Sequence, residues 1–145
     1  MPERETIQRS QQDAREGKSP STQAGEFVRE EIHHVREGKH GARSPQQAIA
    51  IGLSKARRSG VKLGAPKGPS PLRKKAERDV EAGKNPRRKT SGKRARAISA
   101  ALKRESKGSA GRQAVSRQAK KSAAKRGKRA RSAAAMKAAR TRKAA

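Results

Sequence analysis

The sequence predicts a mostly α-helical fold with extensive disorder: a small N-terminal helical hairpin, followed by discontinuous basic helices and flexible linkers. The first reason is composition, because only 30% of the 145 residues are hydrophobic, while 40 Lys+Arg against 12 Asp+Glu give a net charge of +28. Such chains typically stay disordered or fold on a partner. The second is that helical apolar spacing is concentrated in residues 19–63, and the third is that Pro and Gly interrupt the chain beyond them.

Residues 1–18 are the first predicted unit, a polar N-terminal helix that ends near Gly17. Its apolar anchors are Ile7 and Ala14, which lie seven positions apart and therefore on one face. Two apolar anchors bury little surface, so we expect a marginal and exposed helix.

Residues 19–63 are the predicted helical hairpin module. We expect Ser21 or Thr22 to cap its first helix, which runs to Glu37 and ends at Gly38 in the left-handed conformation. The apolar residues of this helix recur at a spacing of three to four and share one face: Ala24, Phe27, Val28, Ile32 and Val35.

The second helix of the hairpin has a clear start signal. Ser44 occupies the N-cap position, Pro45 the first helical position and Gln47 the third, as in a capping box. Gly52 lies on the apolar stripe, where it would let another helix approach closely, and Gly60 ends the helix. The chain is then expected to fold back over the open end of the hairpin through Val61 and Leu63.

Residues 64–71 are a predicted Pro/Gly linker, and residues 72–145 a basic tail rich in Lys, Arg and Ala. In the tail we expect a short helix at 72–82, opened by Ser70-Pro71 and ended by Gly83, and another at 93–107. The last segment, 112–145, has high helix propensity, but like charges at i, i+4 oppose helix formation. We therefore expect it to be disordered in water and helical against phosphates.

Charge separates the two halves of the chain. Residues 1–60 carry 11 basic and 8 acidic side chains, whereas residues 61–145 carry 29 and 4. An excess of this size predicts a polyanionic partner. The candidate nucleic-acid-binding residues are the clustered cations of the tail, joined by three from the end of the second hairpin helix: Lys55, Arg57, Arg58, Arg73, Lys74, Lys75, Arg87, Arg88, Lys89, Lys93, Arg94, Arg96, Lys120, Lys121, Lys125, Arg126, Lys128, Arg129, Arg131, Arg140, Arg142 and Lys143.

Duplex DNA is favoured over RNA as this partner. The chain has no Trp or Tyr and a single Phe, so it lacks the aromatic platforms on which unpaired bases stack. We expect the tail to bind the phosphate backbone rather than a base sequence. RNA stays open as an alternative, because ribosomal proteins also carry long basic extensions.

Several other classes of function are disfavoured. The absence of Cys excludes a disulfide framework and a Cys-based zinc site. No nucleophile elbow or phosphate-binding glycine loop occurs, so we predict neither an enzyme nor a cofactor. His33, His34 and His40 are interpreted as surface polar residues and not as a metal site. Without a long apolar run or an apolar leader, the expected location is cytoplasmic and nucleoid-associated, with no membrane partner.

The Lys-His-Gly turn at residues 39–41 and the helix QAIAIGLSKAR at residues 47–57 carry a resemblance. Residues 25–63 resemble a group of small basic bacterial proteins that are usually labelled as DNA-binding or plasmid-stabilisation proteins. The resemblance covers the hairpin and implies no catalytic residue. Residues 120–145 are similar in composition to the Lys/Ala-rich arms of linker histones and bacterial histone-like proteins.

The function expected from the sequence is therefore sequence-independent DNA binding by a nucleoid-associated or histone-like protein that neutralises duplex phosphates. One alternative is a plasmid maintenance factor whose head binds a protein. Another is an RNA-binding or ribosome-associated protein. In each case the hairpin is the predicted place for a protein partner or for self-association, because its apolar stripe is small.

Overall fold

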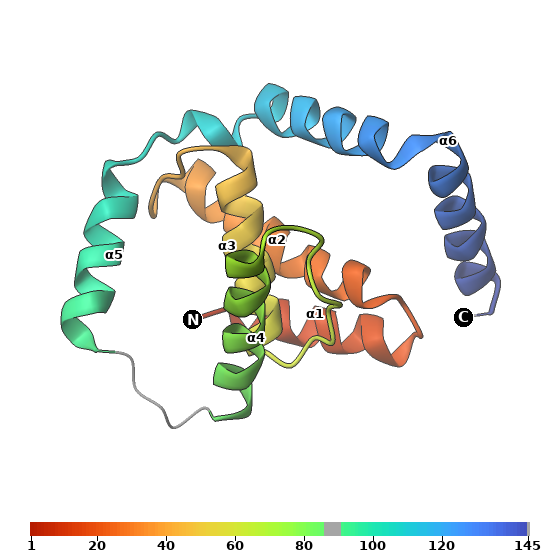
Figure 1. Cartoon of the computed structure of the whole chain (residues 1–145), viewed down its shortest axis with the longest axis horizontal. Helices are drawn as coiled ribbons and strands as arrows, with labels where there is room; N and C mark the ends of the chain where they lie inside the picture. Colours follow the sequence, from red (N-terminus) through yellow and green to blue (C-terminus); the bar gives the residue numbers. More distant parts are fainter. Residues whose placement is uncertain (86–90, 145) are drawn as a thin grey trace.

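The computed structural model describes residues 1–85 and 91–144 and places α-helix in most of them (Figure 1). The predicted α-helical class is confirmed, and these two ranges contain no strand. The predicted extensive disorder is not supported, because the basic half of the chain is also helical. The elements are α1 (Arg4–Arg15), α2 (Pro20–Glu37), α3 (Pro45–Arg58), α4 (Ser70–Lys84), α5 (Gly92–Arg104), the 3-10 turn η1 (Gly108–Ala110) and α6 (Arg112–Ala144).

The hairpin of α2 and α3 begins each of its helices with a Ser-Pro pair. Ser44 Oγ accepts a hydrogen bond from the Gln47 amide at 3.2 Å, as predicted. The cap of α2 is Ser19, whose Oγ accepts from the Thr22 amide at 3.4 Å, so the expected cap at Ser21 or Thr22 is wrong. The reason is Pro20, whose fixed φ suits the first helical position and so places the cap at the residue before it, Ser19.

Gly52 sets the distance between α2 and α3. A Cβ at this position would lie 2.7 Å from Val28 Cα and 2.9 Å from Val28 N, so the two helix backbones meet at the glycine. The close approach predicted for Gly52 is confirmed. Beside it lies an apolar cluster in which Phe27 is fully buried. Leu63 packs onto this cluster, as expected from the predicted fold-back. The buried members are Ala24, Phe27, Ala56 and Val61, and Ile7, Leu53 and Leu63 pack against them.

Helix α1 lies along α2 and is less exposed than its polar sequence suggests. Ile7 packs against the cluster around Phe27, and Thr6 and Ser10 are buried in the same interface. Small polar residues and Ile7 therefore form the contact face of α1, whereas the second predicted anchor, Ala14, is exposed.

A second apolar cluster fixes the turn between α2 and α3 to residues far along the chain. Val35, Ala42, Ala48 and Ala110 are buried together. The amide of Gly41 donates to the Leu102 carbonyl at 2.8 Å, and that of Ala42 donates to the Ser106 carbonyl at 3.0 Å. The segment between α5 and α6 is thus docked on the hairpin turn.

Helix α4 packs on α3 and differs from the prediction at both ends. Ser70 is its first residue and provides no side-chain cap, and the helix continues through Gly83 to Lys84. Gly83 lies inside the helix. A Cβ there would lie 2.7 Å from the Arg58 carbonyl oxygen, so the missing side chain allows α4 to pack closely on α3 and does not end the helix. Ala76 and Asp79 are buried on the same side of α4.

Helices α5 and α6 extend away from the bundle of α1 to α4 (Figure 1). Helix α5 contacts no other helix in the described ranges, and α6 touches only η1 and α3. The expectation that residues 112–145 are disordered is wrong for 112–144. Eleven of the 33 residues of α6 are Ala, and the helix propensity of Ala, Lys and Arg outweighs repulsion of about 0.2–0.5 kcal/mol per charged pair. At Gly127, where a break was predicted, φ is 72° and ψ is 164°, and α6 changes direction.

Candidate nucleic-acid interface

Helix α6 carries thirteen Lys and Arg and no acidic residue. Among the residues that the structure describes, none of these thirteen cations has a carboxylate within ion-pair distance: Arg112, Arg117, Lys120, Lys121, Lys125, Arg126, Lys128, Arg129, Arg131, Lys137, Arg140, Arg142 and Lys143. All thirteen are exposed. The sequence-predicted cations of this segment are therefore available to an anion.

The cations of α6 surround the helix instead of forming one stripe. An α-helix turns about 100° per residue, so Lys120, Lys121 and Arg126 point in three different directions. The Ala residues between them give neither limb an apolar face. This arrangement presents positive charge on every side of a thin rod.

Two further predicted clusters are exposed on the other outer helices. On α4 these are Arg73, Lys74 and Lys75; on α5 they are Lys93, Arg94 and Arg96. The predicted cluster Arg87-Arg88-Lys89 lies outside the described residues.

The three cations predicted from the end of α3 are placed differently from one another. Lys55 points into the hairpin, where its Nζ lies 2.7 Å from Glu31 Oε2 and 3.1 Å from Glu30 Oε1. Arg58 is bound to Asp79 of α4, and Arg57 is only half-buried with no carboxylate partner in the described ranges. Lys55 thus leaves the set of outward-facing cations, because it compensates buried carboxylates.

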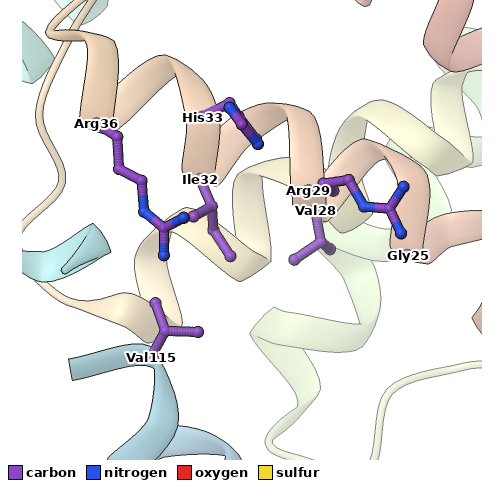
Figure 2. Close-up of a pocket in the computed structure, with 7 residues that line it drawn as sticks. All are labelled: Gly25, Val28, Arg29, Ile32, His33, Arg36 and Val115. Atoms are coloured by element: carbon purple, nitrogen blue, oxygen red, sulfur yellow. The ribbon is translucent and has the colours of Figure 1, made fainter. Parts of the chain in front are cut away.

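Sequence reasoning missed two arginines that border a shallow groove between α2 and the start of α6. Figure 2 shows Arg36 and Ile32 of α2 pointing toward Val115 of α6, with Arg29 further along α2. Arg36 Nε donates to the Ala110 carbonyl at 2.8 Å, and Arg29 pairs with Glu26 at 3.3 Å. Their i, i+7 spacing is a signal for one helix face, but it says nothing of which segment lies opposite.

A buried polar cluster lies under the turn of the hairpin. The side chains of Glu30 and Glu31 are 2% and 0% exposed, and Lys55 lies between them. Burial raises the pKa of Glu30, but the nearby Thr6 hydroxyl and hydrogen bonds from the Glu3 amide and Lys55 outweigh it, so the pKa stays below its ordinary value. Burial lowers the pKa of Lys55, and the carboxylates of Glu31 and Glu30 more than reverse this.

Two of the three histidines belong to this cluster. The side chains of His34 and His40 are 12% and 18% exposed, whereas His33 is exposed. His34 Nε2 lies 2.9 Å from Glu3 Oε1, and His40 Nε2 lies 3.2 Å from Glu31 Oε1. The interpretation of all three as surface residues is therefore wrong for His34 and His40. The cause is tertiary: α1 brings Glu3 onto α2, and the turn brings His40 back over it.

None of the helices in residues 1–85 and 91–144 combines the length and the apolar character needed to cross a bilayer. Comparisons of the chain with protein-family models, with curated proteins and with solved structures gave no match.

Proposed function

We propose that this protein binds duplex DNA independently of sequence and neutralises its phosphates, as a nucleoid-associated, histone-like factor. The observation that carries the proposal is α6, whose thirteen cations are exposed and without acidic partners. Repulsion within such a helix is relieved when phosphates lie among the cations, so the charge pattern itself favours a polyanion.

The distribution of the charges supports backbone contacts and not base reading. Sequence reading requires a few side chains held toward base edges on one helix face, whereas the α6 cations surround the helix. The chain has no Trp or Tyr, and its single Phe, Phe27, is fully buried, so no Phe, Tyr or Trp ring is free to stack on an unpaired base. Both points favour a duplex over a single strand.

The break at Gly127 supports contact with a curved surface. Each limb of α6 is about 15–17 residues long and spans about 22–25 Å at 1.5 Å per residue. A straight rod touches a cylinder over a short length, and a bent rod keeps both limbs close to it. Each limb then has its own set of cations for the phosphates it passes.

The salt dependence of binding gives the first test. If about nine cations contact phosphates, the slope of log K against log salt is about −8. Full-length protein should give this slope on duplexes of equal length and unrelated sequence, with equal affinity for each. Strong preference for one sequence, or a shallow slope, would contradict the proposal.

Matched charge variants locate the interface. Replacing Lys120 and Lys121 by Gln should make the slope about 1.8 units less steep and weaken binding about tenfold near 0.2 M salt. The control replaces Arg9 and Arg29 by Gln. Both arginines pair with Glu26, at 3.1 and 3.3 Å, and Arg9 also pairs with Glu5 at 3.5 Å, so this variant should change both quantities much less. Equal effects of the two double variants would mean that net charge alone drives binding.

Two other functions stay proposals that the same assay separates. Structured RNA and single-stranded DNA are the competing arms, and a preference for RNA would indicate a ribosome-associated or other RNA-binding role. Weak binding to every nucleic acid would favour the alternative of a plasmid-maintenance factor with a protein-binding hairpin, which the resemblance of residues 25–63 suggests.

A further inference from the structure

The buried cluster under the hairpin turn is separate from the exposed cations of α6 that are proposed to contact phosphates. Its members face the interior, and three of them bring metal-ligating atoms together. One ligand atom from each of Glu31, His34 and His40 lies within 4.8 Å of the others. The rings of His34 and His40 meet edge to face, with centroids 6.2 Å apart.

The outer hydrogen bonds of both histidines leave the inner nitrogens as the ones with free lone pairs. His40 Nδ1 lies 3.0 Å from the Gly41 carbonyl, which only accepts, so Nδ1 carries the proton and Nε2 faces Glu31. In the same way, His34 Nε2 donates to the Glu3 carboxylate, which leaves Nδ1 free in the neutral ring. Histidines that bind a metal typically donate their second N–H to a carboxylate or a backbone carbonyl.

Glu31 is an independent indication of a ligand. Its side chain is fully buried, and Oε1 accepts no hydrogen bond within the described part of the chain. Lys55 lies at ion-pair distance from Oε2, and His40 faces Oε1. A buried carboxylate oxygen opposite an imidazole lone pair is a repulsive arrangement unless the ring takes up a second proton or a metal ion lies between the two groups.

We propose that Glu31, His34 and His40 bind one Zn²⁺ ion, with water as the fourth ligand. Two imidazoles and one carboxylate are a set that Zn²⁺ takes in tetrahedral sites. With neutral imidazoles, the carboxylates of Glu3, Glu30 and Glu31 exceed the ammonium groups of Lys39 and Lys55 by one charge, which favours a cation.

Binding would fasten α2 to the turn that follows it. Zinc bonds of about 2.0–2.1 Å bring tetrahedral ligands to about 3.4 Å from one another, and His40 Nε2 already lies 3.2 Å from Glu31 Oε1. That turn also holds Gly41 and Ala42, which bind the segment before α6. The ion would therefore stabilise the base from which α6 projects.

The test uses full-length protein freed of metal with EDTA. Zn²⁺ should raise the unfolding midpoint by roughly 5–15 °C at saturating concentration, and Co²⁺ should give the visible d–d absorption of a tetrahedral site. Mg²⁺, which prefers oxygen ligands, should do neither. H34Q and H40Q should each weaken Zn²⁺ binding at least tenfold, and H33Q, the exposed neighbour on α2, should leave it unchanged.

A measurement on the unaltered chain keeps the test independent of whether the variants fold. The protein has three histidines, so imidazole NMR signals can be assigned individually. Zn²⁺ should shift the signals of His34 and His40 and leave those of His33 in place. If Zn²⁺ has no effect on the midpoint, or shifts all three histidines alike, the cluster is an imidazolium–carboxylate network and the proposal is wrong.

Discussion

Arg58 of α3 binds Asp79 of α4 through two hydrogen bonds, from Nε at 2.9 Å and from Nη2 at 2.7 Å, both to Oδ1. Ser54 Oγ donates to the other oxygen, Oδ2, at 2.6 Å. The Asp79 side chain is 6% exposed, so this carboxylate has exchanged water for three donors from one helix. The contact attaches the first helix of the basic half to the hairpin.

Removal of this carboxylate should detach α4. We expect Asp79→Ala to lower the free energy of unfolding by about 1–3 kcal/mol, because Ser54 and Arg58 lose a charged acceptor in a partly buried site. Urea unfolding followed by circular dichroism measures the loss. Glu77→Ala, on the exposed side of α4, is the control and should change stability by less than about 0.5 kcal/mol; an equal loss would show that only helix charge matters.

A methyl group at the helix crossing should be costly. Gly52→Ala places a Cβ 2.7 Å from Val28 Cα, so α2 and α3 must separate, and we expect a loss of about 1–3 kcal/mol. Gly25→Ala in α2 is the matched control, because a Cβ there meets nothing within 4 Å. That variant should gain about 0.5–1 kcal/mol from helix propensity. Equal signs for the two variants would contradict the close approach.

The bend of α6 should depend on Gly127. Its φ of 72° with ψ of 164° is a conformation that glycine alone adopts readily. Gly127→Ala should therefore straighten α6 into one helix and raise the ellipticity at 222 nm. Because the chain has no Cys, spin labels at Ala124→Cys and Ala139→Cys can report the distance, with about 22 Å between backbone positions in a straight helix. An unchanged distance distribution would show that neighbouring residues, and not Gly127, set the bend.

Local signals in the sequence predicted the elements, and long-range pairing decided what the signals left open. Ser44-Pro45 and Gly52 could be interpreted from their neighbours, because capping and close packing have local signatures. The position of Lys55 could not be predicted in this way, because a cation at a helix end typically indicates an anion-binding site. Only the fold shows that Glu30, 25 positions earlier, lies beside it. The prediction that His34 and His40 lie on the surface was wrong for the same reason, because residues distant in sequence cover them.

The packing of α4 had a signal that composition concealed. Ala76, Asp79 and Gly83 follow i, i+3, i+7 spacing, and each faces α3. A stripe of small residues on a highly charged helix indicates a contact face, even without a large apolar side chain. The alanines of α6 also indicated a helix. The prediction of disorder gave more weight to the net charge than to these alanines.

The carboxylates around Lys55 should make stability fall at both ends of the pH range. The pKa of Glu30 is lowered in the folded state, so its contribution is complete above its ordinary value of 4.5 and is lost as the pH falls below it. The pKa of Lys55 is raised, so its contribution is complete below 10.5 and is lost as the pH rises beyond it. Urea midpoints in EDTA should therefore be level at intermediate pH and decline outside it.

Lys55→Met should reverse the way in which stability changes as the pH falls below neutral. Without the ammonium group, the Glu30 carboxylate stays buried with no cation beside it, so Glu30 binds a proton more readily in the folded than in the unfolded state. The variant should be destabilised by about 3–5 kcal/mol at neutral pH and should regain stability as the pH falls toward 5. Lys62→Met, at an exposed lysine without a carboxylate partner in the described ranges, should keep the normal loss of stability in acid. If both variants lose stability in acid alike, Lys55 does not compensate the buried pair, and its place inside the hairpin needs another cause.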